Sequence, residues 1–145
     1  MNKKIKIFTD GGARGNPGPA AIGIVITDDK GKVIKKHAEF IGKATNNQAE
    51  YKALIKGLEL AKELNPQEVN CYLDSELVVK QMRQEYRVKD KDLQPLFIKA
   101  WNAAIKLKKV SYHHIGRELN KEADKLLNLE LDKHSWFCVK AKFVV

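Results

Sequence analysis

The pattern of apolar and polar residues divides the chain into strands followed by alternating strands and helices. Apolar runs or alternation predict strands, and apolar residues every three or four positions predict helices. The expected strands are 4–10, 20–27, 32–41, 68–73 and 110–115, and the expected helices are 46–64, 75–85, 92–108 and 120–133. This order predicts an α/β fold, with a mixed five-stranded sheet and helices on both of its faces.

Turn and capping residues support these boundaries. Asp28–Gly31 is typical of a hairpin turn between the second and third strands. Thr45 or Asn46 is a suitable N-cap for the first long helix, and we expect Asp92 and Asn120 to cap two later helices.

Four acidic residues stand where a carboxylate is costly. Asp10 and Asp74 end strand-like runs, Glu50 begins the apolar stripe of a helix, and Asp124 lies in a helical row expected to face covered surface. Each has an ordinary explanation when taken alone, as a turn residue, a helix cap, a first-turn acid or one half of a salt bridge. Gathered at one edge of a core, however, they would repel one another and resist desolvation unless a cation compensated them.

The ligand types indicate which cation this would be. Oxygen ligands without a close Cys pair or paired His favour magnesium or manganese over zinc. Two such ions about 4 Å apart can stabilise the attacking and leaving oxygens of a phosphoryl transfer. The four acids therefore predict a metal-dependent site for phosphate chemistry.

Length and net charge limit which kind of protein carries this site and which partners it binds. The 145 residues fit one domain, 1–145, and carry a net charge of +9. Charge of this kind is accounted for by solubility alone, but together with an acidic cluster it also suits a phosphate-backbone partner. No apolar run reaches the roughly 20 residues of a membrane span, so we expect a cytoplasmic protein that does not bind membranes.

Four blocks of sequence resemble the successive signatures of type 1 ribonuclease H. They are FTDGGARGNPGP at 8–19, TNNQAE at 45–50, LDS at 73–75 and NKEAD at 120–124. The resemblance covers nearly the whole chain and implies a ribonuclease H-like fold. It also implies hydrolysis of the RNA strand of an RNA–DNA hybrid, which leaves 5′-phosphate and 3′-hydroxyl ends. Asp10, Glu50, Asp74 and Asp124 would hold two Mg²⁺ ions, with Mn²⁺ as a substitute.

The same resemblance implies substrate contacts from a set of small or short polar residues: Gly11, Asn16, Thr45, Asn46 and Asn47. Groups of this kind suit sugars and phosphates better than base edges, which is consistent with little sequence preference. Turn formation by Asn16 and helix capping by Thr45 and Asn46 are expected at the same time.

The chain departs from the family pattern in two places. Many members carry a loop histidine before the last acid; ungapped counting places His114 there, but a shorter loop places Arg117 nearest the metals. We favour Arg117, as a contact to phosphate or leaving group. The second departure is the absence of the basic handle, an extra helix and lysine-rich loop with which some members hold the DNA strand. The residues between Asp74 and the helix near 92 allow only one helix and a turn.

Three further expectations concern the tail, the cysteines and competing functions. The apolar segment 136–145 is expected to pack on the domain. Cys71 is expected to be a buried apolar residue, and a disulfide with Cys138 is not expected in a cytosolic chain. We expect a monomeric ribonuclease H without an obligate protein partner. There are two alternatives: a catalytically silent module that binds hybrids or duplexes, and a related metal nuclease that cleaves DNA.

Overall fold

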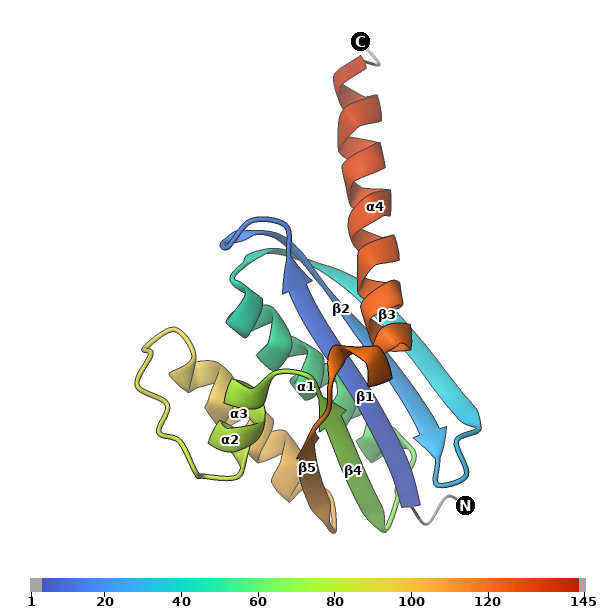
Figure 1. The fold of residues 1–145 in the computed structure, drawn as a ribbon, viewed down its shortest axis with the longest axis vertical. Helices are drawn as coiled ribbons and strands as arrows, with labels where there is room; N and C mark the ends of the chain where they lie inside the picture. The colour runs from blue at the N-terminus through green and yellow to red at the C-terminus, as the bar shows by residue number, and fades with distance from the viewer. Residues whose placement is uncertain (1–3, 144–145) are drawn as a thin grey trace.

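The computed structural model describes the backbone of residues 4–143 and the side chains of residues 4–135. It contains a mixed five-stranded sheet in the order β3-β2-β1-β4-β5, with helices on both faces (Figure 1). The strands are β1 (Lys4–Ala13), β2 (Gly18–Asp28), β3 (Val33–Ala44), β4 (Glu68–Leu73) and β5 (Val110–His114). The helices are α1 (Asn46–Glu63), α2 (Glu76–Met82), α3 (Gln94–Ile105) and α4 (Lys121–Phe143), with a short 3₁₀ turn η1 (Arg117–Leu119). The predicted fold class is confirmed.

The register of the sheet brings two acids together. Asp74 directly follows β4, but the prediction that Asp10 ends its strand is wrong, because β1 continues to Ala13. β1 pairs with β2 in antiparallel fashion, and with β4 in parallel fashion. In the parallel pair Thr9 lies opposite Leu73. The next residues, Asp10 and Asp74, therefore occur side by side at the same edge of the sheet.

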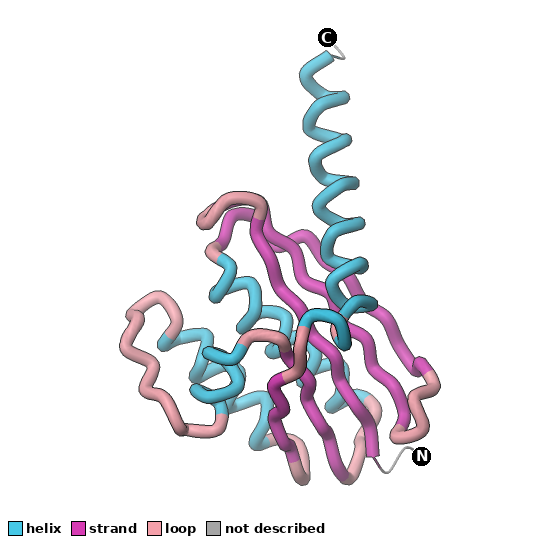
Figure 2. The backbone as a smooth tube through the Cα atoms, viewed as in Figure 1, coloured by secondary structure: helices cyan, strands magenta, loops and turns pink. Residues whose placement is uncertain are grey.

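The main core lies between the sheet and α1. Ile7 and Ile24 are fully buried on this face, and Gly57 allows α1 to approach closely, because a Cβ there would lie 3.0 Å from methyl groups of Ile7 and Thr9. On the opposite face the start of α4 crosses the sheet (Figure 2), where Leu127 and Leu131 pack with Ala21 and Phe40. The burial of both faces of β2 explains its near-continuous apolar run, whereas buried residues alternate with more accessible ones in β4.

Several helix boundaries and caps in the structure differ from the predicted ones. α2 ends at Met82 rather than near 85, and α3 has Leu93 at its N-cap position with no side-chain cap, so Asp92 is not the cap. The prediction that the last helix ends near 133 is wrong, because α4 continues to Phe143. The backbone of 136–143 is thus helical, and the packing of side chains 136–145 lies outside the described residues.

Two other caps have different outcomes. Thr45 caps α1 in a capping box with Gln48, as predicted. Asn120 precedes α4, but its amide nitrogen donates to the Thr9 carbonyl at 2.9 Å, and its side-chain oxygen accepts no hydrogen bond. The side chain of Asn120 therefore ties the start of α4 to β1 instead of capping the helix.

Two smaller expectations, the missing handle and the buried Cys71, are confirmed in the described part of the chain. Residues 83–93 connect α2 to α3 without a further helix, so the described chain lacks a helical handle there. Cys71 is free and fully buried. Trp101 is half-buried and stacks on Phe97, with the ring centroids 5.9 Å apart. Among the described helices none combines the length and apolar character needed to cross a membrane.

Because β2 and α4 are in close contact, we expect alanine substitutions at two glycines to have very different effects on stability. A Cβ on Gly23 would lie 2.2 Å from the carbonyl oxygen of Ala123, whereas a Cβ on Gly12 would first meet a Leu127 methyl at 3.4 Å. Gly23→Ala should therefore destabilise the protein by about 1–3 kcal/mol through overpacking. Gly12→Ala should change the free energy of unfolding much less. Urea denaturation of both variants measures the difference, and equal losses would contradict the described position of α4.

Candidate active site

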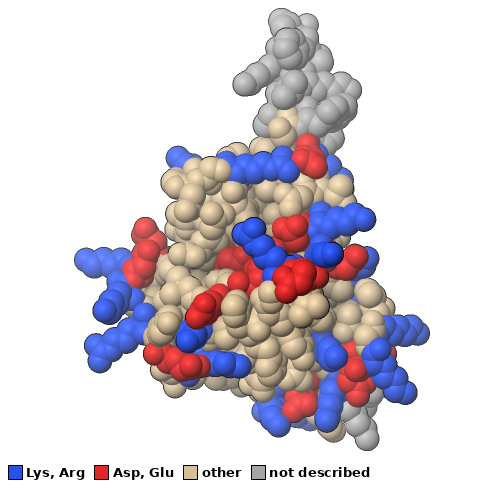
Figure 3. All heavy atoms as spheres, viewed as in Figure 1, with Lys and Arg blue, Asp and Glu red and all other residues tan. Residues whose placement is uncertain are grey.

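A cleft of about 450 Å³ lies where β1 and β4 end, between the first turn of α1 and the start of α4. All four predicted acids line it: Asp10, Glu50, Asp74 and Asp124. Figure 3 shows acidic side chains near the middle of this face of the molecule, with basic side chains around them. Four separate elements therefore bring the sequence-predicted acids to one place.

Three of these acids form a compact ligand set. Asp10, Glu50 and Asp74 each offer one oxygen, and these oxygens lie within 4.8 Å of one another. The side chains of Asp10 and Glu50 are only 6% and 8% exposed. Glu50 Oε1 accepts a hydrogen bond from the Gly11 amide at 3.2 Å, but its buried Oε2 has no hydrogen-bond partner.

The electrostatics of the set favour a bound cation. Burial raises the pKa of Asp10 to about 7, and the nearby charges of Asp74 and Asp124 contribute to the increase. Burial, followed by the charge of Asp10, raises the pKa of Glu50 well above its usual range. Burial also raises the pKa of Asp74, against the nearby charge of Arg117. A buried carboxylate oxygen without a partner, in an all-oxygen ligand set, fits a hard divalent ion.

Asp124 differs from the other acids. Its side chain is exposed at the mouth of the cleft, so the prediction that it faces covered surface is wrong. Asn120, Leu127 and Leu131 in the same row are buried as expected. Asp124 borders the cleft between these buried residues, close enough to Asp10 to raise its pKa.

Gly11 is required by the packing of α1. A Cβ at this position would lie 2.1 Å from the carbonyl oxygen of Ala49. Because Glu50 follows Ala49, the missing side chain sets how closely Glu50 approaches β1. Gly11 also lines the cleft, and its predicted contact with ribose stays a prediction.

The residues predicted to contact substrate differ in whether they line the cleft. Asn46 and Asn47 are exposed and line the cleft, whereas Asn16 and Thr45 do not line it. The Asn46 backbone amide donates to Asn16 Oδ1 at 2.9 Å, and Asn46 Oδ1 accepts from the Ala13 amide at 2.9 Å. Asn16 thus joins the glycine-rich turn to α1, a role that differs from the predicted turn formation. The side chain of Asn46 bonds to the residue at the end of β1 and does not cap α1, whose N-cap is Thr45.

Arg117 and His114 are clearly separated by the structure. Arg117 lies in η1, lines the cleft and lowers the pKa of Asp74. His114 ends β5, is exposed and does not line the cleft. Sequence reasoning missed Arg14 and Asn128, which also line it; the four-residue spacing from Asp124 to Asn128 was the available signal for the second.

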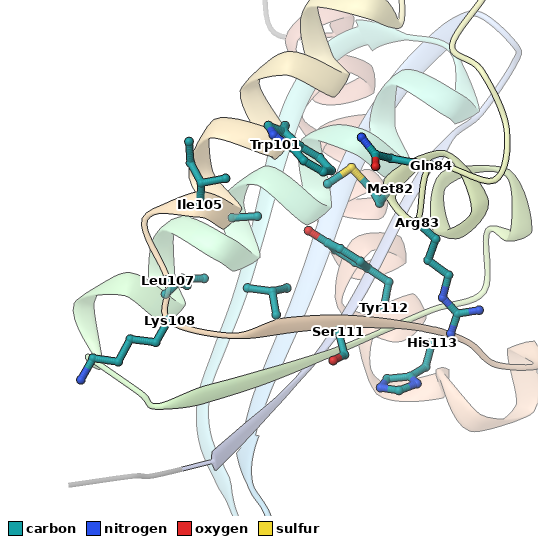
Figure 4. Close-up of a pocket in the computed structure, with 12 residues that line it drawn as sticks. Met82, Arg83, Gln84, Trp101, Ile105, Leu107, Lys108, Ser111, Tyr112 and His113 are labelled. Carbon is teal, nitrogen blue, oxygen red and sulfur yellow. The ribbon is translucent and has the colours of Figure 1, made fainter.

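A larger hollow of about 780 Å³ lies elsewhere, between the end of α2, α3 and β5 (Figure 4). Trp101, Met82 and Tyr112 contribute much of its apolar wall, and Arg83 and Lys108 lie at its rim. None of the four acids lines it. The smaller acidic cleft is therefore the candidate active site.

Comparison with known proteins gives matches over most of the chain. The family described as reverse transcriptase-like matches residues 8–129. Ribonuclease H of Helicobacter pylori is 31% identical over 143 residues, which cover 92% of this chain and 96% of that protein. A bifunctional protein of Mycobacterium tuberculosis is 42% identical over 130 residues, or 89% of this chain; the match spans only 36% of that longer protein.

Solved structures agree with these matches. RNase H1 from Halobacterium salinarum has a TM-score of 0.87 at 38% identity, covering 90% of this chain and 98% of that one. LC11-RNase H1 in complex with an RNA/DNA hybrid has a TM-score of 0.86 at 44% identity, with the same coverage. The mixed sheet and its acidic cleft define a ribonuclease H-like protein. The chain belongs to the type 1 ribonuclease H family.

The raised pKa of Asp10 predicts how the metal-free protein responds to pH. Below pH 3.8, the usual pKa of an aspartate, the carboxyl is protonated in both the folded and unfolded states. Between that value and about 7 the unfolded chain loses its proton first, so the folded state loses stability as pH rises. Asp10→Asn removes this penalty and should stabilise the protein at pH 8 by on the order of 1–3 kcal/mol.

Thermal unfolding in EDTA at pH 4 and pH 8 measures this effect. The gain from Asp10→Asn should be large at pH 8 and small at pH 4. Asp29→Asn, which changes an exposed aspartate of the β2–β3 turn, is the matched control. A lower melting temperature for Asp10→Asn at pH 8 would contradict the described burial of the carboxylate.

Proposed function

We propose that this chain is a magnesium-dependent endoribonuclease that hydrolyses the RNA strand of RNA–DNA hybrids and leaves 5′-phosphate and 3′-hydroxyl ends. The observation that carries the proposal is the convergence of four carboxylates in one cleft of a chain with a net charge of +9. A similar protein, LC11-RNase H1, was solved with an RNA/DNA hybrid. Mere binding of a polyanion would not favour four clustered negative charges.

We infer that Asp10, Glu50, Asp74 and Asp124 hold two Mg²⁺ ions, for which Mn²⁺ can substitute. When bound, the ions supply positive charge for the attacking and leaving oxygens of the phosphodiester. The protein supplies the arrangement of ligands. Glu50 is held by the Gly11 amide through one oxygen, so its other oxygen remains available as a ligand.

Other residues of the cleft would bind and orient the substrate. Asn46 and Asn47 are exposed at the first turn of α1, where short amides can contact sugar and phosphate oxygens. The 2′-hydroxyl is the group that distinguishes RNA from DNA at such a site. Arg117 lies beside Asp74 and offers a charged donor for phosphate or the leaving oxygen.

The proposal is tested with labelled RNA–DNA, RNA–RNA and DNA–DNA duplexes in Mg²⁺ and in Mn²⁺. Only the RNA strand of the hybrid should be cut, and end analysis should find 5′-phosphate and 3′-hydroxyl. Cleavage of DNA–DNA would favour the DNA nuclease, and binding without cleavage would favour the silent module.

Asp10→Asn should lower the cleavage rate by more than about a hundredfold, because even residues that only support a metal ligand reach that effect. Binding of the hybrid and the fold should be retained, since Asn keeps the shape of Asp. Cleavage rates, hybrid affinity and circular dichroism are measured together. Normal cleavage by this variant in Mg²⁺ would refute the assignment.

We expect alanine substitutions of Arg117 and His114 to have different effects on kcat. Arg117→Ala should lower kcat by about 10- to 100-fold, the equivalent of one hydrogen bond to a charged group. His114→Ala is the matched control and should change kcat by less than about twofold, because His114 does not line the cleft. Single-turnover cleavage measures both, and the reverse order of effects would assign the auxiliary role to His114.

The remaining expectations about the whole protein stay predictions. They are a monomer, no obligate protein partner, no membrane binding and a cytoplasmic location.

A further inference from the structure

Three polar residues of α4 share the face that borders the acidic cleft. Asp124, Asn128 and Asp132 follow one another at four-residue intervals, so they lie above one another on the helix. Leu127 and Leu131, on the neighbouring face, are buried against the sheet. The polar row therefore has a fixed position relative to β1.

Asn128 donates to Asp124 in a way that fixes its own orientation. Its Nδ2 lies 2.9 Å from the Asp124 backbone carbonyl oxygen and 3.2 Å from Asp124 Oδ1. A backbone carbonyl oxygen and a carboxylate oxygen are both acceptors, so the amide nitrogen and not the amide oxygen must face them. Asn128 thus holds one oxygen of the fourth carboxylate.

Asp124 needs such support more than the other acids do. Asp10 and Glu50 are buried and restrained by packing, whereas the Asp124 side chain is exposed on the surface of a helix. A free aspartate there could rotate away from the cleft, and doing so would relieve its repulsion with Asp10 and Asp74. A donor one turn further along the helix opposes this rotation.

The helix turn that carries Asn128 is itself tied to Arg14, the residue that follows β1. Arg14 Nη2 donates to Asp132 Oδ1 at 2.6 Å and lies 3.5 Å from the Asn128 carbonyl oxygen. The bond from Asn120 to Thr9 of β1 and this contact therefore hold α4 on both sides of Asp124. An exposed ion pair contributes little to global stability, so its effect here is to set the position of the helix.

We propose that Asn128 is a positioning residue for the fourth metal ligand: its amide holds Asp124 oriented into the cleft and leaves the second carboxylate oxygen available to a cation. The proposal rests on the proposed function and assigns a role to a residue outside the four-acid set. Partners that orient metal ligands are generally worth about 10- to 100-fold in metal affinity or activity.

The test is calorimetric titration of Mn²⁺ into the metal-free protein, without substrate. Asn128→Ala should weaken the Mn²⁺ affinity by about tenfold. Asn128→Gln keeps an amide donor at the spacing that allows Gln–Asp hydrogen bonds, and should stay within about threefold of the wild type. Asn102→Ala is the control, because it removes an exposed asparagine from α3, away from the cleft.

A second readout separates positioning from folding. Alanine is a better helix former than asparagine, so the melting temperature of Asn128→Ala in EDTA should equal or exceed that of the wild type. With hybrid substrate, the Mg²⁺ concentration for half-maximal rate should rise about tenfold, while KM for the hybrid stays unchanged.

Two results would overturn the proposal: an Asn128→Ala protein that binds Mn²⁺ as tightly as the wild type, or an Asn128→Gln protein weakened as much as Asn128→Ala. The metal titration is independent of the proposed function. If the wild type bound Mn²⁺ but cut no hybrid, the proposed activity would fail, and the difference between the Ala and Gln variants would still decide the role of Asn128.

Discussion

The parallel pairing of β1 with β4 sets the position of the first two acids, and the rest of the site is arranged around them. Because Thr9 lies opposite Leu73, Asp74 follows the last residue of β4 directly beside Asp10, which is still paired with Gly23 of β2. The same pairing places two like charges side by side. Burial raises the pKa of both; the charge of Asp74 raises the pKa of Asp10 further, and the charge of Asp124 raises that of Asp74. The sheet therefore creates an electrostatic cost that its hydrogen bonds and core must offset, and that a cation removes.

Close backbone contacts bring the other two acids to this edge. Gly11 lets α1 come near enough for Glu50 to reach the strand end, and Gly23 does the same for α4 on the opposite face, where it meets Ala123 just before Asp124. Side chains at these glycines would move an acid away from the cleft. The apolar core and the acidic site are thus positioned by the same contacts, so the two faces of the sheet cannot be repacked independently.

The sequence predicted local features well and contacts between distant segments less well. Periodicity gave the order of strands and helices, and the four acids were recognisable because each interrupted an apolar pattern. The cap at Thr45 was predictable because its partner, Gln48, is three residues away. The amide of Asn120 was assigned to its own helix because its actual partner, the Thr9 carbonyl, lies 111 residues earlier. The exposure of Asp124 was missed because helical periodicity does not reveal where a cleft opens beside a helix.

The acids differ in how their positions are held, and this difference has a functional logic. Asp10 and Glu50 are nearly buried, Asp74 is half-buried, and Asp124 is exposed. Packing can fix the first two, but an exposed carboxylate must be held by hydrogen bonds that leave it accessible. Substrate and cations can reach the cleft only from the open side, so at least one ligand must stand there. The polar row of α4 meets both requirements, because its buried neighbours fix the helix while Asn128 orients Asp124.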